Sequence, residues 1–254
     1  MVPLSAPSRA RAVRSALVVA ETGSTNADLT ALAREGAANG TVLASGYQAS
    51  GRGRLGRTWT APPETSIALS VLVRPVVEPR RWTWLPLITG LAVAEGLRRA
   101  TGVPAEVKWP NDVLVEDRKI CGILAERVET PDGAACIIGM GINVTLTEDE
   151  LPVPTATSLA LAGATTTDRI TVIATVLRAF DLLYRHWEST DEDTAFAASY
   201  VARCSTIGRE VKVIVDESHT VRGTAEAVDD DGRLVVRTRE GLQTFGAGDI
   251  VHLR

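Results

Sequence analysis

The sequence is poor in the residues that build disulfide frameworks and metal sites. Among 254 residues there are three cysteines and three histidines. The cysteines are odd in number and widely spaced, which excludes a readable disulfide framework or zinc pattern and favours a reducing compartment. The histidines show no metal-binding spacing, so we expect them to be ordinary surface or core residues.

Long apolar runs and an excess of positive charge are also lacking. The apolar run near the N-terminus, Ala16–Ala20, is too short for a secretion signal, and no run approaches the roughly 20 residues of a membrane span. The formal net charge of −4 disfavours a general electrostatic contact with nucleic acid, so any anion site has to be local. These absences predict a cytoplasmic protein with neither a membrane nor DNA as its partner.

Periodic apolar residues predict an α+β body followed by a small all-β unit. Spacings of three and four residues predict helices at 24–36, 84–102 and 171–187. We place the start of the first helix at Thr25, with Asp28 at capping-box spacing, and its end at Gly36. Strands are predicted at 41–48, 66–75, 105–109, 113–117, 119–129 and 134–144, the last four as an antiparallel meander.

The pattern of apolar and polar residues changes near Gly208. From there on, short stretches of alternating apolar and polar residues, separated by DDDG and EG turns, predict a small β-barrel. We therefore expect three parts. They are a flexible leader at 1–14, a catalytic domain at 15–204 and a C-terminal domain at 205–254.

Residues 51–57, GRGRLGR, place three arginines on a backbone that glycine makes flexible. Glycine lets the backbone approach a ligand closely, and guanidinium groups donate in pairs to carboxylate or phosphate oxygens. Ordering such a loop costs about 1–2 kcal/mol per residue, so we expect it to be mobile when empty and ordered by an anion. The alternatives are a solvated loop or an RGG-like nucleic-acid segment, but such segments recur in long tracts whereas this one is single.

Two more motifs are weak when taken alone. KWPND at 108–112, with Lys119 shortly after it, reads as a hairpin turn beside an exposed lysine. GMGIN at 139–143 contains one GxG, which is also typical of close packing or a bulge within a strand.

Together, these stretches resemble the biotin protein ligases in order and spacing. The matching pieces are GSTN (23–26), Gln48 with GRGRLGR and Trp59, KWPND (108–112), KICGIL (119–124) and GMGIN (139–143). The C-terminal stretch with GTAEAVDDDGRLVV resembles the small C-terminal domain of that family. The resemblance implies a class II synthetase-like catalytic body, with a central mixed or antiparallel sheet and flanking helices, and a C-terminal SH3-like β-barrel.

The resemblance also implies a ligase that uses ATP, biotin and Mg²⁺. Biotin's carboxylate attacks the α-phosphorus of ATP, which gives biotinyl-5′-AMP and pyrophosphate. A lysine of a biotin carboxyl carrier domain, as found in biotin-dependent carboxylases, then takes the biotinyl group and releases AMP.

Site residues follow from motif position. The resemblance implies that the catalytic residues are Lys119, Arg52 and Asp112. The biotin-binding residues are Ser24, Thr25, Gln48, Gly51, Arg52, Arg54, Lys119 and Gly122. The ATP-binding residues are Arg54, Arg57, Trp59, Asn111, Lys119 and Asn143. The metal ligands stay unknown.

Simpler interpretations of some residues stay open. Ser24 and Thr25 can act only as helix caps, Asp112 as a turn former and Trp59 as a core residue. Leu55 stands where the family usually has arginine, so we expect the loop to lack one phosphate contact or some of its polarity. Cys121 stands where a small residue is common.

Two other functions compete with this one. A lipoate or octanoyl ligase shares the α+β body and the adenylate chemistry, but it lacks the GRGRxGR and KWPND pair. A biotin-sensing DNA-binding regulator needs an N-terminal winged helix, for which the 22 residues before Gly23 leave no room. We therefore expect the monofunctional type of ligase.

Overall fold

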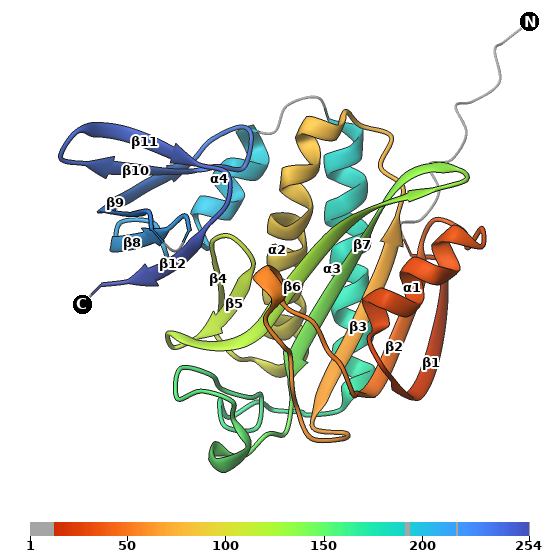
Figure 1. Ribbon diagram of the computed structural model, residues 1–254. Helices are drawn as coiled ribbons and strands as arrows, with labels where there is room; N and C mark the ends of the chain where they lie inside the picture. Colours follow the sequence, from red (N-terminus) through yellow and green to blue (C-terminus); the bar gives the residue numbers. More distant parts are fainter. Residues whose placement is uncertain (1–12, 191–193, 217, 254) are drawn as a thin grey trace, which may run out of the picture.

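The computed structural model describes residues 13–190, 194–216 and 218–253. It contains two β-sheets, with helices packed mainly on the larger one, which confirms the predicted α+β class (Figure 1). The predicted leader, residues 1–14, lies almost entirely outside the described residues. No helix in the described part of the chain combines the length and the apolar character that crossing a bilayer requires.

The larger sheet has seven strands in the order β1-β2-β3-β7-β6-β5-β4. Their bounds are Ser15–Thr22 (β1), Thr41–Gln48 (β2), Ser66–Val73 (β3), Ala105–Lys108 (β4), Asp112–Val115 (β5), Arg118–Thr130 (β6) and Gly133–Asn143 (β7). Only β1 and β2 are parallel, so the sheet is mixed, and the predicted meander from β4 to β7 is confirmed. The sequence pattern does not predict β1, because this edge strand is exposed along nearly its whole length and shows no alternation.

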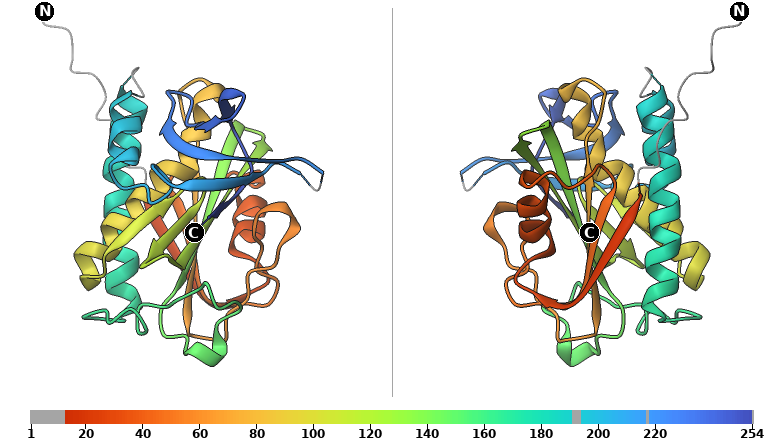
Figure 2. Two further views of the ribbon diagram at one scale, coloured as in Figure 1. Left: turned by 90° about the vertical axis from the view of Figure 1, so that its left-hand side faces the viewer. Right: turned by 90° about the vertical axis from the view of Figure 1, so that its right-hand side faces the viewer.

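Helices cover the two faces of the large sheet unequally (Figure 2). The short helix α1 (Thr25–Arg34) lies on one face, whereas α2 (Trp84–Thr101) and α3 (Arg169–Ser189) pack together on the other. The short helix α4 (Thr194–Val201), which the sequence pattern does not predict, contacts α2. The 3₁₀ turns are η1 (Arg54–Gly56), η2 (Pro79–Thr83) and η3 (Glu148–Glu150). On the face that carries α1, the loop containing η1 runs over β6 and β7 (Figure 1).

The long helices form where apolar residues recur every three or four positions. In α3, Val176 and Phe180 are buried, and Asp168 caps the helix by accepting a hydrogen bond from the backbone of Thr171 (2.9 Å). Helix α2 ends at Gly102, whose φ of 75° is a left-handed conformation that glycine adopts without steric penalty. Because α2 lies between the sheet and α3, most of its side chains are buried.

The predicted start of α1 is wrong by one residue. Ser24 is the N-cap, and its hydroxyl accepts a hydrogen bond from the backbone of Ala27 (3.4 Å). Thr25 is the first helical residue, and its hydroxyl bonds to Gln48 and Ser70 of the sheet instead of capping the helix. Both residue types cap helices well, so composition could not separate them. The predicted end is confirmed, since Gly36 follows the C-cap with a φ of 92°.

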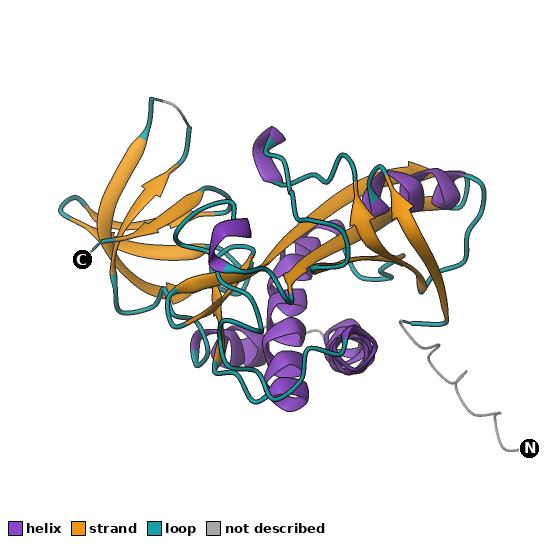
Figure 3. Cartoon of the chain, turned by 90° about the horizontal axis from the view of Figure 1, so that it is seen from below, coloured by secondary structure: helices purple, strands orange, loops and turns teal. Residues whose placement is uncertain are grey.

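The C-terminal sheet is antiparallel, with the strand order β11-β10-β9-β8-β12, and lies beside the larger sheet (Figure 3). Its strands are Glu210–Ile214 (β8), Thr220–Val228 (β9), Leu234–Thr238 (β10), Gly241–Phe245 (β11) and Asp249–His252 (β12). Two indole N–H groups fasten it to the body. Trp84 donates to the carbonyl of Asp230 (2.8 Å) and Trp109 to that of Gly232 (3.0 Å). The predicted division at residues 204 and 205 falls within the link between α4 and β8.

Candidate active site

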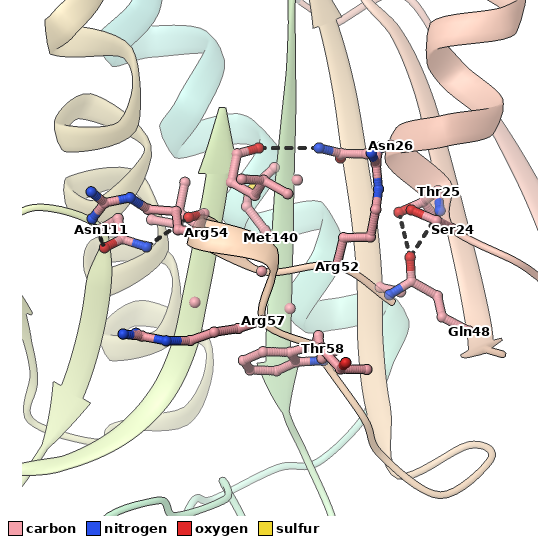
Figure 4. A pocket seen from close by; sticks show the side chains of 18 of the residues that line it. Ser24, Thr25, Asn26, Gln48, Arg52, Arg54, Arg57, Thr58, Asn111 and Met140 are labelled. Atoms are coloured by element: carbon pink, nitrogen blue, oxygen red, sulfur yellow. Dashed lines mark hydrogen bonds between the residues drawn. The ribbon is translucent and has the colours of Figure 1, made fainter. Parts of the chain in front are cut away.

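A cavity of about 130 Å³ lies on the α1 face of the large sheet, beneath the Gly/Arg loop, residues 51–57 (Figure 4). The start of α1, the end of β2, the loop, the β4–β5 turn and strands β3, β6, β7 and β12 all contribute residues to its walls. Ten of the thirteen predicted site residues line it: Ser24, Thr25, Gln48, Arg52, Arg54, Arg57, Trp59, Asn111, Lys119 and Gly122. Segments far apart in the sequence therefore meet at one place.

Uncharged hydrogen-bonding groups of α1 and β2 form one part of the cavity wall. The backbone N–H and the hydroxyl of Thr25 lie 2.8 and 3.0 Å from Oε1 of Gln48 (Figure 4). Ser24 and Thr25 are almost fully buried, at 5% and 3% exposure. Their capping and cavity-lining positions are compatible, because Ser24 caps the helix while both side chains remain in the wall.

A buried polar network continues from this end and contains residues that motif reasoning missed. The Ser70 hydroxyl lies 2.7 Å from Oγ1 of Thr25 and 2.6 Å from Oδ1 of Asn26. The Asn26 amide in turn donates to Oε2 of Glu126 (2.7 Å). Asn26 belongs to the GSTN motif and could have been found there, but Ser70 and Glu126 lie in strands without any motif signal.

Each arginine of the Gly/Arg loop has an acceptor within the protein. Arg52 lies 3.0 Å from Oε2 of Glu126. Arg54 donates to Oδ1 of Asn111 (2.9 Å) (Figure 4). Arg57 forms an ion pair with Asp249, a residue of β12 that also lines the cavity and that the sequence did not indicate. The loop thus brings three cations to the rim of one cavity, and the C-terminal sheet supplies one of their counter-ions.

Lys119 contributes a fourth cation from β6. Its Nζ lies 2.6 Å from Oδ1 of Asp112, and the side chains are 35% and 19% exposed. Asp112 is not itself part of the cavity wall, but the contact with Lys119 places it immediately beside the cavity.

The Trp59 indole rests on a floor that only glycine provides. A Cβ atom at Gly141 would come within 2.5 Å of the ring, and one at Gly122 within 3.0 Å. The Lys119 ammonium lies 5.9 Å from the ring centroid. Among the described residues, none accepts a hydrogen bond from the buried indole Nε1 of Trp59. Trp59 therefore packs over the cavity floor and is only partly buried.

Gly51 and Asn143 are predicted site residues that the structure does not bring into the cavity wall. Gly51 is buried under the loop, where a Cβ would come within 2.4 Å of the Trp59 carbonyl. Asn143 is 3% exposed, and its amide donates to the carbonyl of Thr157 (2.9 Å). Their assignment to ligands stays a prediction.

The cavity carries both neutral hydrogen-bonding groups and cations. At α1 it offers neutral donors and acceptors with one cation beside them, because Arg52 and Asn26 share the Glu126 carboxylate. Arg54 and Arg57 lie across the cavity from α1 (Figure 4), and Lys119 adds a cation from β6. Cations gathered around one small space stabilise negative charge on a ligand. Such a cavity suits an anionic ligand that also carries neutral hydrogen-bonding groups.

Two segments of the chain match known protein families. Residues 20–143 match the Biotin/lipoate A/B protein ligase family, a description that does not separate biotin from lipoate ligases. Residues 206–253 match the Biotin protein ligase C terminal domain, which favours the former. The chain belongs to the biotin protein ligase family. It is therefore a ligase, as its motifs predict.

Relatives within the biotin protein ligase family cover nearly the whole chain. It is 43% identical over 242 residues to the biotin–[acetyl-CoA-carboxylase] ligase of Mycobacterium tuberculosis, covering 93% of this chain and 88% of that protein. It is 31% identical to the bifunctional ligase/repressor BirA of Escherichia coli, covering 84% of this chain and 66% of that protein. The solved biotin protein ligase from Aquifex aeolicus, in complex with biotin and ATP, superimposes with a TM-score of 0.77 at 29% identity, over 95% of this chain and 99% of that one.

The two departures from the usual biotin protein ligase pattern lie outside the cavity wall. Leu55 is 74% exposed at the loop tip, with a left-handed φ of 55°. Cys121 is fully buried on the opposite face of β6, and burial raises the pKa of its thiol. Cys121 is therefore an unreactive core residue, and Leu55 leaves the three arginines in place.

Proposed function

We propose that the chain joins biotin to ATP, forming biotinyl-5′-AMP and pyrophosphate, and then transfers the biotinyl group to a lysine of a biotin carboxyl carrier domain. The observation that carries this proposal is that one cavity is lined both by neutral hydrogen-bonding groups at the start of α1 and by four cations. The names of the relatives from M. tuberculosis and A. aeolicus support the same reaction.

The first half-reaction brings two anions together. The biotin carboxylate is already ionised near neutral pH, so the step needs no general base. It needs alignment and positive charge around the carboxylate and the α-phosphate. In the proposal Lys119 and Arg52 serve this centre, Arg54 lies between biotin and nucleotide, and Arg57 serves the outer phosphates.

The contacts that these cations make within the protein are replaceable. Exposed ion pairs such as those of Arg52 and Arg57 contribute only about 0–1 kcal/mol each. A triphosphate offers several acceptor oxygens and carries more charge than Glu126 or Asp249. We therefore expect ligand oxygens to replace Glu126 and Asp249 as partners of the loop arginines. This agrees with the expectation that a bound ligand orders the loop. The cavity also has to widen, because it encloses about 130 Å³ and drug-sized ligands usually occupy roughly 300–1,000 Å³.

In the proposal the ureido ring of biotin binds at the α1 end of the cavity. This ring needs a few donors and acceptors, and Ser24, Thr25 and Gln48 supply them at the N-terminus of α1. In the proposal Trp59, which lies on the glycine floor, packs against the adenine, and Asn111, which pairs with Arg54, contacts the nucleotide.

Magnesium would enter with the nucleotide. Among the described residues there is no group of three or more histidine, cysteine, aspartate or glutamate side chains that could hold a metal ion. Mg²⁺ in nucleotide sites usually keeps several waters and is held by substrate phosphates with one or two carboxylates. The isolated carboxylates near the cavity fit this second arrangement, and the ion would offset the charge of the triphosphate.

Asp112 is the candidate proton acceptor of the second half-reaction. An unperturbed lysine amine has a pKa near 10.4, so only about one in a thousand is neutral at pH 7.4. Once Lys119 turns to the ligand's anionic groups, the Asp112 carboxylate loses its 2.6 Å partner and can accept a proton from the incoming amine.

We expect Asp112→Asn to slow transfer from preformed biotinyl adenylate by about 100-fold at pH 7.4. The deficit should shrink as the pH rises toward the pKa of the amine, because more amine is then neutral. Single-turnover transfer to a carrier domain measures this. Asp117→Asn is the matched control, since Asp117 lies in the next turn and pairs with Arg209 outside the cavity. An unchanged transfer rate in Asp112→Asn would leave Asp112 with only its turn-forming role.

A direct assay tests the overall function. The protein is incubated with biotin, Mg·ATP and a carrier domain, and mass spectrometry follows free biotinyl adenylate and the biotinylated lysine. Without the carrier domain we expect to detect free biotinyl adenylate. With the carrier domain present we expect to detect its biotinylated lysine. A parallel incubation with lipoate should give neither product. Activation of lipoate in place of biotin would overturn the proposal.

A further inference from the structure

One extra residue in β6 decides which face of the sheet Lys119 reaches. Val113 of β5 lies opposite Cys121 of β6, but the next residue of β5, Leu114, lies opposite Lys119. Ile120 is therefore a β-bulge, a residue without a partner in β5.

The bulge reverses the alternation of side chains along β6. Lys119 and Gly122 are three positions apart, so regular alternation would place them on opposite faces. Instead both line the cavity. The consecutive residues Ile120 and Cys121 are both fully buried in the core, which is where the two faces exchange. Without the extra residue, Ile120 would face the cavity and Lys119 the core.

A segment from outside the regular strands holds the bulged backbone. Next to β6, strand β7 ends at Asn143, and residues 155–157 take its place beside Lys119. The backbone N–H of Lys119 donates to the carbonyl of Thr155 (2.7 Å), and its carbonyl accepts from the N–H of Thr157 (2.8 Å). We call residues 155–157 the strap.

Asn143 fastens the strap to the end of β7. Its side-chain amide donates to the Thr157 carbonyl (2.9 Å), and its own carbonyl accepts from the backbone of Leu159 (3.1 Å). Asn143 and Thr157 are each 3% exposed, so these bonds are shielded from water. Buried hydrogen bonds of this kind are costly to break because their groups have no replacement partner.

We propose that Thr157 and Asn143 are positioning residues that hold the bulge and thereby aim Lys119 at the reacting carboxylate and phosphate. The inference rests on the proposed role of Lys119 and goes beyond it. Asn143 acts through the backbone of the strap, in addition to any contact with nucleotide.

The test compares two proline variants of the strap. Thr157→Pro removes the N–H that donates to Lys119, whereas Thr155→Pro removes one that donates to no described residue. We expect Thr157→Pro to lower kcat for biotin-dependent ATP–pyrophosphate exchange by about 30-fold, with the KM values for biotin and ATP within about threefold. Thr155→Pro should stay within about twofold of the wild type, and equal activity of the two variants would overturn the proposal.

A double-mutant cycle separates positioning from general damage. In a Lys119→Met background, Thr157→Pro should cause no further loss, because the group that it positions is absent. In an Arg52→Ala background the two losses should multiply. If Thr157→Pro does not fold, Asn143→Ala enters the same cycle, with thermal unfolding as the check on folding. If the activity losses of Thr157→Pro and Lys119→Met multiply in the double variant, the positioning role of the strap is wrong. If Lys119→Met alone is fully active, the proposed role of Lys119 is wrong instead.

Discussion

Replacing Lys119 with methionine is expected to slow biotinyl adenylate formation by about 10²–10³-fold without unfolding the protein. Methionine keeps most of the side-chain length but removes the charge that faces the cavity. Lys119 is 35% exposed and its contacts are with Asp112 and the Trp59 ring, so the core does not depend on it. Biotin-dependent ATP–pyrophosphate exchange measures the effect, and thermal unfolding checks the fold.

Lys108→Met is the matched control for this experiment. Lys108 lies opposite Asp112 in the β4–β5 hairpin, but it does not line the cavity, and burial lowers the pKa of its ammonium. We expect Lys108→Met to slow exchange by less than about fivefold, because its charge acts from outside the reacting centre. Equal losses in both variants would mean that the general potential near Asp112 matters, and not contact with the ligand. Near-normal ATP–pyrophosphate exchange by Lys119→Met would show that Lys119 is not a catalytic residue.

The parts of the fold that follow from the sequence are those with a strong local period. Helix α3 buries one face and exposes the other, so its pattern is readable, and the long apolar stretch of α2 and the turn-separated strands from β4 to β7 are equally plain in the sequence. Strand β1 is missed because it sits at the sheet edge with Val18 72% exposed, and no face of it is selected for burial. The helix cap at Ser24 is misplaced because two good capping residues are adjacent.

The site divides in the same way. Residues within short motifs, such as Lys119 and Gln48, could be named from their order along the chain. Glu126 and Asp249 could not, because each meets its arginine only after the chain folds, and they are single carboxylates in ordinary strands. The bulge at Ile120 could not be predicted either, because it depends on the register between β5 and β6 and not on composition.

Replacing Gly139 with alanine is expected to lower the free energy of unfolding by about 2–4 kcal/mol and to weaken biotin binding by about 100-fold. A Cβ at this position would come within 2.4 Å of Oδ1 of Asn26. Asn26 is 4% exposed and bonded to Ser70 and Glu126, so its amide cannot move aside without leaving buried polar groups unpaired. Urea denaturation and calorimetric titration with biotin alone measure the two effects.

The double variant Asn26→Ala with Gly139→Ala shows whether this contact is the cause. Removing the amide makes room for the new methyl group, so the double variant should be no less stable than Asn26→Ala alone. Its biotin affinity should stay low, because the wall next to Thr25 has lost its amide. Gly246→Ala is the control for the substitution itself and should change stability by less than about 0.5 kcal/mol, since its nearest neighbour would lie 3.8 Å from the new Cβ. Losses that simply add in the double variant would show that Gly139 serves the backbone of β7 and not the space that Asn26 fills.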